Sequence, residues 1–369
     1  MDRCDTCVLP RAGDLIQFEG ETCTLCADGT TVETATNQMR ADELDRFVER
    51  IKEDGRGRPY DCVVGVSGGR DSSYMLHQLV RRHGLRCIAG YYRTPYTPDA
   101  TDANVVRLTE RLGVKLVRLD IDTEYHNRWA RRAVMLWRKQ PTPVHANLTC
   151  APCKQVNKEI LKLARQKRVR YLAMGSNRYE AVQLAVGVNT RAAAKKQRGI
   201  KLGGFPRLIQ AGLAALSRSG SLWRFIPVGL KCVLYITQDA PLLRFLYPEV
   251  TTFSYFYLAS WDEQECEAAL RELGWELPPG CDTSWRADCT FAEVKNRMFE
   301  EMTGMTYVDA FFSNRIRAGD LTREEALRRM EVEGRPSDER LQAACDVLEV
   351  PTEIFSRSTG SDVSGGIRA

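Results

Sequence analysis

The chain has 369 residues, which is enough for about two or three domains and a substantial core. Hydrophobic residues make up 43% and charged residues 27%, as is ordinary for a soluble globular protein. No window approaches 18 consecutive apolar residues, which excludes a membrane-spanning helix, and the first residues, MDRCDTC, contain no apolar segment typical of a signal peptide. We therefore expect a cytoplasmic protein. The net charge of +5 permits an anionic partner without requiring one.

The chain begins with about 40 residues that have few periodic apolar positions and predict a small module held by metal. A helix is expected at 41–52. Strands are then expected at 62–66, 87–92, 115–121 and 169–175. Helices between and after them are expected at 71–83, 103–112, 127–138 and 154–166. This alternation predicts an α/β domain with a parallel sheet covered by helices on both faces, whose ligands lie beyond the carboxyl ends of the strands.

The last part of the chain has a looser pattern. Helices are expected at 262–273, 291–303 and 322–333, the last with a capping box formed by Thr322 and Glu325. The expected organisation is therefore a zinc-ribbon module (1–40), an ATP-binding α/β domain (41–190), and a basic loop followed by a mainly helical closing region (191–369). The basic loop at 191–207 contains no acidic residue, and it is either a solvated loop or a flap that gathers the phosphates of a substrate.

The segment YDCVVGVSGGRDSSY (60–74) contains a buried strand that breaks at Ser-Gly-Gly and continues as a helix. Such a turn directs several backbone N–H groups and the positive end of the helix dipole to one point, which suits a phosphate. Gly68 and Gly69 allow a close approach of the backbone, and Ser67 and Ser72 can donate from their hydroxyls. No Lys follows the glycines, so the turn is not a Walker A loop, and it is not the G-x-G-x-x-G loop of dinucleotide-binding folds either.

SGGRDS instead resembles the SGGxDS signature of the PP-loop ATP pyrophosphatase family. In that family the loop holds the β,γ-pyrophosphate of ATP, a carbonyl oxygen of the substrate attacks the α-phosphate, and a nitrogen or sulfur nucleophile then displaces AMP. The resemblance implies a phosphate-binding loop formed by Ser67, Gly68, Gly69, Asp71 and Ser72. It also implies a catalytic role for Asp71. It also implies that Arg70 can reach phosphate and that Tyr91, Tyr92, Arg93 and Gly175 lie near the adenosine. Mg²⁺ is expected, because the leaving pyrophosphate needs charge neutralisation.

Thirteen cysteines in a cytosolic chain favour metal binding over disulfides. The first four, Cys4, Cys7, Cys23 and Cys26, are spaced C-x2-C-x15-C-x2-C, which matches a zinc ribbon. Four thiolates leave no open position on a tetrahedral ion, so we expect a structural Zn²⁺ site.

Three further segments resemble the N-acetyl sugar amidotransferases. They are CDTCVLP…IQFEGETCTLC at the start, TSWRADCTFAEVKNRMFEEMTG with the pair Asp288–Cys289 and Lys295, and VDAFFSNRIRAGDLTREEALRRME. That family uses ATP and ammonia, commonly from a separate glutaminase subunit, to convert a sugar acetamido group into an acetamidino group. The resemblance implies an anionic, nucleotide-linked N-acetylated sugar as the substrate.

Cys150 and Cys153 form a third C-x-x-C pair, which follows a helix on the expected ligand side of the sheet. They are free thiols, half of a zinc site, or catalytic ligands of an iron–sulfur cluster. PP-loop thiouridine synthetases hold a [4Fe–4S] cluster with a C-x-x-C pair and one later cysteine. FIPVGLKC (225–232) resembles their later segment, so the third ligand would be Cys232 or Cys289, and Cys281 is not excluded.

Two rival functions therefore stay open beside amidotransfer. One is sulfur transfer to a tRNA base or a small molecule, with a sulfur-donor protein as partner. The other is a non-catalytic zinc-ribbon protein that binds RNA. His145 lies close to Cys150 in sequence and could approach the site. Asn177, Arg178 and Glu180 either face the substrate or ATP, or form a polar helix cap.

Overall fold

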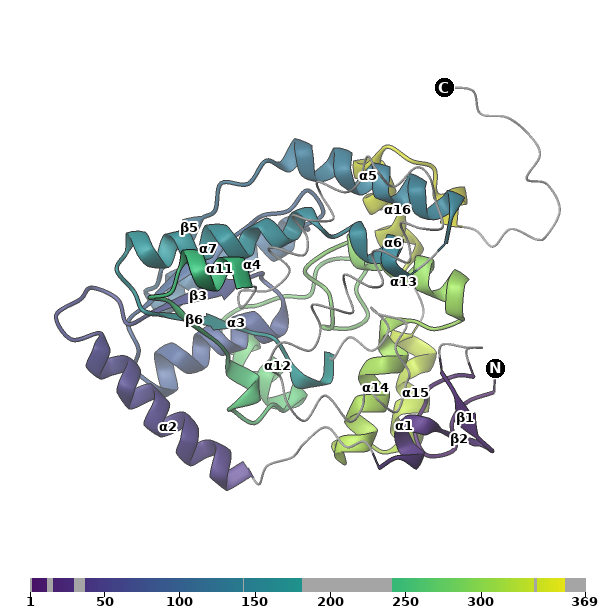
Figure 1. Cartoon of the computed structure of the whole chain (residues 1–369), viewed down its shortest axis with the longest axis horizontal. Helices are drawn as coiled ribbons and strands as arrows, with labels where there is room; N and C mark the ends of the chain where they lie inside the picture. Colours follow the sequence, from purple (N-terminus) through teal and green to yellow (C-terminus); the bar gives the residue numbers. More distant parts are fainter. Residues whose placement is uncertain are drawn as a thin grey trace.

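The structure is a computed structural model that describes residues 2–11, 16–29, 37–141, 143–180, 241–334 and 337–355. Its centre is a five-stranded sheet in the order β5-β4-β3-β6-β7, in which all neighbouring strands are parallel (Figure 1). The strands are β3 (Cys62–Val66), β4 (Cys87–Tyr91), β5 (Lys115–Arg118), β6 (Tyr171–Met174) and β7 (Thr251–Ser254). The expected parallel α/β sheet and its first four strands are thus confirmed. β7 comes from beyond residue 190, so the sheet contains strands from both sides of the expected domain boundary.

Helices connect the strands and cover both faces of the sheet. They are α2 (Asn37–Asp54), α3 (Arg70–His77) with a π-helical turn η2 (Gln78–Arg82), α4 (Asp99–Leu112), α5 (Thr123–Lys139), α6 (Pro143–Leu148), the 3₁₀ turn η3 (Pro152–Lys154), α7 (Gln155–Gln166), the 3₁₀ turn η4 (Arg178–Glu180) and α11 (Pro241–Leu246). Alternate side chains of β3 enter different cores: Val64 and Val66 pack with α2, α3 and α4, whereas Val63 packs with α7 and α11. This alternation is the period that a strand buried on both faces requires.

The C-terminal region is mainly helical, as expected. It contains α12 (Glu263–Glu272), α13 (Phe291–Thr303), α14 (Tyr307–Ala318), α15 (Arg323–Glu333) and α16 (Asp338–Leu348), with 3₁₀ turns η6 (Tyr255–Tyr257) and η7 (Thr352–Phe355). α12, α13 and α15 confirm the expected helices, and the side chain of Thr322 caps α15 by accepting from the Glu325 N–H. The basic segment 191–207 and Cys232 lie outside the described residues.

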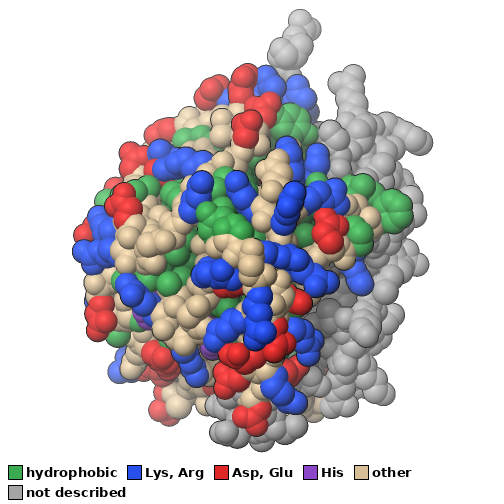
Figure 2. All heavy atoms as spheres, turned by 90° about the vertical axis from the view of Figure 1, so that its left-hand side faces the viewer, with side chains coloured by type: hydrophobic (Ala, Val, Ile, Leu, Met, Phe, Trp, Pro, Cys, Tyr) green, Lys and Arg blue, Asp and Glu red, His purple; other side chains and the backbone are tan. Residues whose placement is uncertain are grey.

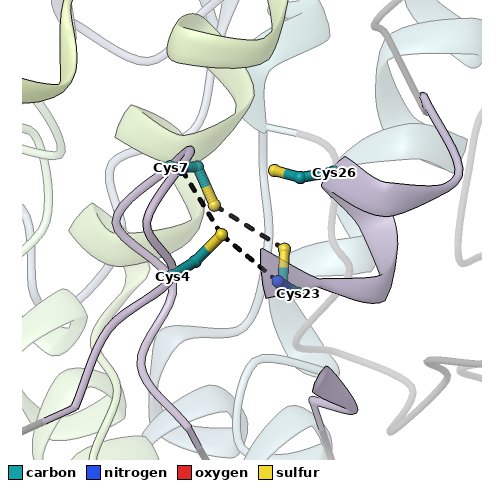
Figure 3. Close-up of side chains that lie close together, drawn as sticks. All are labelled: Cys4, Cys7, Cys23 and Cys26. Atoms are coloured by element: carbon teal, nitrogen blue, oxygen red, sulfur yellow. Dashed lines mark hydrogen bonds between the residues drawn. The ribbon is translucent and has the colours of Figure 1, made fainter. Parts of the chain in front are cut away.

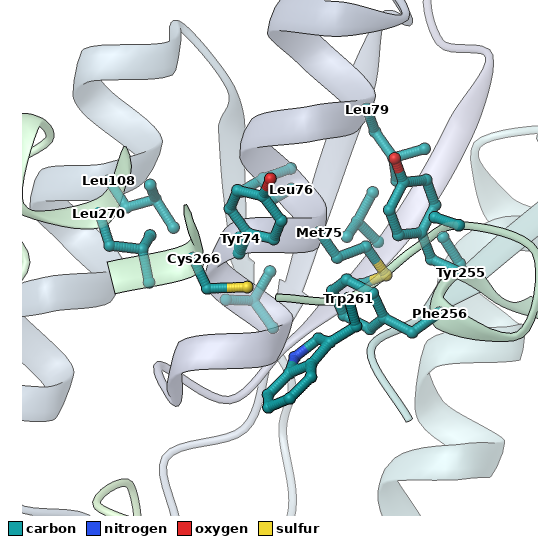
Figure 4. Packing of buried hydrophobic residues seen from close by; sticks show 14 of the residues in the cluster. Tyr74, Met75, Leu76, Leu79, Leu108, Tyr255, Phe256, Trp261, Cys266 and Leu270 are labelled. Atoms are coloured by element: carbon teal, nitrogen blue, oxygen red, sulfur yellow. The ribbon is translucent and has the colours of Figure 1, made fainter. Parts of the chain in front are cut away.

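The core around α3 joins the sheet to the C-terminal region. Met75 of α3 and Leu79 of η2 are fully buried and pack with Phe256 of η6, while Cys266 and Leu270 come from α12 (Figure 4). The helix that follows the Ser-Gly-Gly turn is therefore fixed by apolar contacts on two sides, which restrains the turn itself.

The N-terminal module consists of β1 (Phe18–Glu19), β2 (Thr22–Cys23) and α1 (Thr24–Ala27), and it lies against α14 and α15 (Figure 1). The guanidinium of Arg323 in α15 donates to the carbonyls of Cys4 (3.1 Å) and Cys7 (3.0 Å), and Arg3 pairs with Asp309 of α14. These polar contacts attach the module to the C-terminal helices.

The molecular face near α2 and α7 carries many Lys and Arg side chains interspersed with Asp and Glu (Figure 2). Several of the basic side chains in this part of the chain are paired: Arg165 with Glu249, and Arg170 with Asp54. The face is therefore of mixed sign, unlike the uniform basic patch that nucleic-acid binding favours. Among the described residues, no helix combines the length and apolar character needed to cross a membrane.

Candidate functional site

The Ser-Gly-Gly turn lies at the carboxyl end of β3, in the middle of the sheet. Gly68 has φ +87°, and a Cβ at this position would lie 2.6 Å from Thr101 Cγ2 and 2.9 Å from the Thr101 carbonyl oxygen. Both the conformation and the space therefore require glycine. Gly175, which follows β6, lies against Ser72, since its Cβ would be 2.8 Å from Ser72 Cα. The ends of β3 and β6 thus meet where the strand order reverses, which is where doubly wound sheets bind their ligands.

Hydrogen bonds hold the turn in shape without a ligand. Ser72 Oγ accepts from the Ser67 N–H (3.1 Å) and donates to the Gly69 carbonyl (3.2 Å). Trp275 Nε1–H donates to the Gly68 carbonyl at 2.9 Å. The first N–H groups of α3 have no acceptors inside the helix, and they carry the positive end of its dipole. The turn thus presents N–H donors in a fixed arrangement at the end of β3, as an anion site requires.

Asp71 lies in the first turn of α3, and both of its carboxylate oxygens accept hydrogen bonds. Oδ1 accepts from Arg70 Nε (2.9 Å) and Trp261 Nε1 (3.1 Å), and Oδ2 accepts from Asn177 Nδ2 (3.2 Å). Asn177 follows β6, so Asp71 connects the turn to the neighbouring strand end. Asn177 Oδ1 also accepts from the Tyr179 N–H (3.0 Å) at the start of η4, so Asn177 both contacts the turn residue Asp71 and forms the expected polar cap, while a contact with substrate or ATP stays a prediction.

Arg70 is only 3% exposed, and its guanidinium joins a buried ionic network. Its Nη1 donates to Glu263 Oε1 (2.6 Å) and to Ser284 Oγ (2.7 Å). Contact of Arg70 with phosphate stays a prediction. Glu263 also accepts from Arg315 (2.8 Å) and Arg329 (2.7 Å). Burial by itself would raise the pKa of Glu263, but the three arginines outweigh it and lower the pKa to about 2.

Carboxylates gather beside the turn. A Cβ on Gly69 would lie 3.1 Å from Asp288 Cγ, so Asp288 faces the glycines directly. Glu180 pairs with Arg286 at 3.6 Å. Burial raises the pKa of Glu180; Arg286 opposes this, while the charges of Asp71 and Asp288 add to it. The sequence marked Asp288 only as part of the Asp–Cys pair, and its place at the turn was not expected.

The third cysteine pair lies within electrostatic reach of Cys289, which stands two residues before α13. Burial raises the pKa of Cys153, and the neighbouring Cys150 and Cys289 raise it further. Burial, Asp288 and Cys150 raise the pKa of Cys289 to about 12. The three thiols are therefore close enough for their charges to influence one another, and we call them the thiol cluster, although their sulfur atoms are not as close together as those of the N-terminal cysteines. Cys281, the other described candidate, has its sulfur 2.6 Å from the Arg340 guanidinium.

His126 contacts this cluster and was missed by the sequence analysis. Its Nε2 lies 3.3 Å from Cys153 Sγ, and its Nδ1 lies 2.8 Å from the hydroxyl of Tyr92. Burial lowers the pKa of His126 to about 4, so the ring is neutral at pH 7 and carries one proton. Tyr92, expected near the adenosine, is thus connected through His126 to Cys153. No motif surrounds His126, so only the tertiary structure identifies it. His145 instead has Nδ1 2.7 Å from the Gln140 carbonyl oxygen.

Cationic side chains surround the thiols. Burial lowers the pKa of Lys154, with Lys295 and Arg286 acting in the same direction and Cys150 opposing them. Lys295 Nζ lies 3.4 Å from Asn147 Oδ1 and 5.3 Å from the centre of the Tyr307 ring. Positive surroundings of this kind favour thiolates over thiols when a metal or an electrophile binds.

The four N-terminal cysteines converge on one point (Figure 3). Their sulfur atoms all lie within 4.8 Å of one another, and no other group of at least three His, Cys, Asp or Glu ligand atoms in the described residues meets that limit. Cys7 Sγ and Cys23 Sγ are 3.8 Å apart, as expected for two thiolates bound about 2.3 Å from one tetrahedral ion. Arg317 of α14 donates to Cys7 Sγ (3.5 Å) and lies 4.0 Å from Cys26 Sγ. The four residues fit Zn²⁺, and the guanidinium would offset the negative charge of the thiolates.

Neither the known protein families nor the curated proteins include a match to this sequence. Solved structures give remote similarities. The U34-tRNA thiolase NcsA from Methanococcus maripaludis, with its [4Fe–4S] cluster, is 13% identical over 98% of this chain and 94% of its own, with a TM-score of 0.34. NMN synthetase from Francisella tularensis is 12% identical over 83% of this chain and 96% of its own, with a TM-score of 0.36. NH3-dependent NAD synthetase from Campylobacter jejuni is 16% identical over 58% of this chain and 93% of its own, with a TM-score of 0.29. The proposed function therefore rests on the residues of this chain.

Proposed function

We propose that the protein uses ATP to adenylate an amide or carbonyl oxygen and then replaces AMP with a nitrogen nucleophile. The observation that carries this proposal is the preformed turn at the end of β3. Gly68 is required there both by its φ of +87° and by its contact with Thr101. The turn offers backbone N–H groups and the start of a helix to an anion, but the SGGRDS segment has no lysine to assist γ-phosphate transfer. These features suit retention of pyrophosphate and transfer of AMP.

In the first step, the turn would hold the β- and γ-phosphates while the acceptor oxygen attacks the α-phosphorus. The bond between the α-phosphorus and the bridging oxygen breaks, and pyrophosphate leaves with its electron pair. Charge develops on that leaving group, so N–H groups fixed before the reaction stabilise the transition state most effectively. Ser67 and Ser72 keep the turn in this shape through their mutual contact at 3.1 Å.

Mg²⁺ fits the donors beside the turn. Asp71, Glu180 and Asp288 are hard oxygen ligands, and the pKa of Glu180 is raised by burial and by the other two carboxylates. A divalent cation would relieve that repulsion and neutralise the pyrophosphate. Because the oxygens of the three residues do not lie within 4.8 Å of one another, these carboxylates would attract the ion and share its ligand positions with phosphate oxygens and water.

In the second step, ammonia would attack the activated carbon, and AMP would leave with the former acceptor oxygen. The bound nitrogen must then lose a proton. We assign this role to Lys154, an exposed residue next to Cys153 whose pKa is lowered by desolvation and by the charges of Lys295 and Arg286. The acceptor we propose is an N-acetylated sugar linked to a nucleotide, and the ammonia would come from a separate glutaminase subunit.

A specific observation favours a second candidate, sulfur transfer. The charges of Cys150 and Cys289 act on Cys153, and that of Cys150 acts on Cys289, which supports a common site for the three thiols. Three thiolates among cationic side chains fit a [4Fe–4S] cluster, which is wider than a single ion and would supply an open iron for binding sulfide. In both candidates the adenylation step is the same, and only the nucleophile differs.

The nucleophile is tested by exchanging single cysteines. Cys150→Ala should leave ammonia-dependent turnover of an amidotransferase within a few-fold of the wild type, whereas it should abolish a sulfurtransferase. Iron and acid-labile sulfide measured after anaerobic purification distinguish the cluster directly. If a cluster is present, Cys289→Ser should lose it and the matched variant Cys281→Ser should retain it. Full iron content in Cys289→Ser would show that Cys289 is not the third ligand, which would leave Cys232 or Cys281.

A further inference from the structure

Arg340 is a buried arginine of α16 whose five N–H donors are all engaged by the segment 281–293. Its side chain is 5% exposed. Nε donates to Glu293 (3.3 Å), and Nη1 donates to Cys281 Sγ (2.6 Å) and the Ala287 carbonyl (3.4 Å). Nη2 donates to the carbonyls of Arg286 (3.1 Å) and Cys289 (3.0 Å). A guanidinium offers five donors in one rigid plane, so the segment 286–289 is wrapped around a fixed template.

The segment 286–289 connects the two halves of the candidate site. Arg286 pairs with Glu180, Asp288 faces Gly69 of the turn, and Cys289 belongs to the thiol cluster. The three side chains leave a short stretch of backbone in different directions. That requires an unusual conformation, and Arg286 has φ +54°, which is uncommon for a residue other than glycine. Such strain persists only where the surroundings enforce it.

Hydrogen bonds from neighbouring residues hold the segment in this conformation. Arg340 binds the carbonyls of Arg286, Ala287 and Cys289, so it fixes the backbone at and directly after the strained residue and on both sides of Asp288. On the following side, Thr290 N–H donates to the Tyr96 carbonyl at 2.9 Å, which anchors the segment to the loop after β4. Removing the guanidinium would take a donor from three carbonyls at a partly buried place, of which that of Cys289 keeps a bond from the Ala292 N–H.

We infer that Arg340 is a positioning residue that holds the segment 286–289 as a bracket between the phosphate turn and the thiol cluster. The bracket fixes Asp288 at the turn and Cys289 beside Cys150, so that both reaction steps use one rigid geometry. The catalytic consequence rests on the proposed function, whereas the positional part does not. Arg340 lies outside every segment that the sequence analysis connected with the site, and only the structure connects it.

The claim that Arg340 positions the segment 286–289 can be tested without measuring enzyme activity. Arg340→Lys keeps the charge but loses the planar fork, and Arg340→Ala removes both. In each variant, hydrogen exchange of the amides at 286–289 should become faster, and alkylation of Cys289 should accelerate by about tenfold, since local opening governs both. Arg297→Ala is the matched control. Arg297 also joins α13 to α16, but its guanidinium bonds Asp338 (2.6 Å) instead of the carbonyls of the segment 286–289. Unchanged exchange and alkylation in folded Arg340→Lys would overturn the inference.

The catalytic part is tested by a rescue experiment. The kcat for AMP formation should fall by about 100-fold in Arg340→Ala, because a small displacement of reacting groups costs that much, while the KM for ATP should change little. Guanidinium ion at non-denaturing concentration should restore part of kcat in Arg340→Ala and none in Arg297→Ala. A loss of kcat that guanidinium does not restore would assign Arg340 a purely structural role. If the wild type itself forms no AMP while the exchange results hold, the proposed function fails and the bracket stands.

Discussion

The buried carboxylate of Glu263 connects four elements through one side chain. It accepts from Arg70 of α3, Arg315 of α14 and Arg329 of α15 while it begins α12 itself. Replacing it by Gln removes the negative charge but keeps the shape. Removal of one partner from a buried ionic group costs about 3–5 kcal/mol, because the remaining charges stay buried without compensation. We therefore expect Glu263→Gln to lose stability of that order at pH 7.

The pKa of Glu263 gives an independent value. It is lowered from an ordinary 4.5 to about 2 in the folded protein, chiefly by Arg329 and Arg70 against the opposing effect of burial. Each pKa unit corresponds to about 1.4 kcal/mol, so the ionised carboxylate contributes about 3 kcal/mol to folding. Because the folded-state pKa is the lower one, this contribution is complete above about pH 5 and is lost as the pH falls from there towards 2. The two approaches agree.

The assay is urea unfolding of the wild type and Glu263→Gln at a series of pH values from 7 to 3, followed by tryptophan fluorescence. The difference in the free energy of unfolding should be about 3 kcal/mol at pH 7 and should shrink as the pH falls below 5. Glu272→Gln, an exposed residue at the end of the same helix, is the control and should unfold like the wild type. A difference below about 0.5 kcal/mol at pH 7, or one that does not depend on pH, would refute the reasoning.

Three further predictions concern the other parts of the site. Gly68→Ala should abolish ATP–pyrophosphate exchange, since its Cβ would overlap Thr101, and exchange at the wild-type rate would contradict the preformed turn. Cys4→Ser should lower the zinc content measured by atomic absorption and lower the melting temperature, because metal binding is coupled to folding in such modules; full zinc with an unchanged melting temperature would exclude the site. In metal-free protein at pH 7, Cys153 should react with iodoacetamide much more slowly than an exposed cysteine, since burial raises its pKa well above the ordinary value; rapid labelling would show an activated thiolate.

The sequence was most informative where local chemistry determines structure. The run from Cys62 to Val66 is followed by Ser-Gly-Gly, and this alone predicted a strand, a glycine turn and a following helix, all of which the structure contains, while the binding of an anion at the turn stays a prediction. The spacing of the first four cysteines likewise predicted their convergence, because thiolates at such intervals fit one tetrahedral ion.

The remaining features depend on long-range packing, which a single sequence does not encode locally. β7 is short, and its partly exposed residues do not alternate clearly, so its pairing with β6 was not predicted. His126 and Arg340 occur without any motif, and they become parts of the site only because α5 and α16 pack beside the thiols and the segment 286–289. Asp288 was noticed for its neighbour Cys289, but its contact with Gly69 needed the structure.

The central claim is that the acceptor oxygen attacks the α-phosphorus of ATP. It is tested by incubating the protein with ATP, Mg²⁺, ammonia and a nucleotide-linked N-acetylated sugar whose acetamido carbonyl carries ¹⁸O, followed by mass spectrometry of the nucleotide and phosphate products. Our account predicts AMP and pyrophosphate, with the ¹⁸O atom in the phosphate of AMP, and neither product in Gly68→Ala. Formation of ADP with ¹⁸O in inorganic phosphate would contradict it.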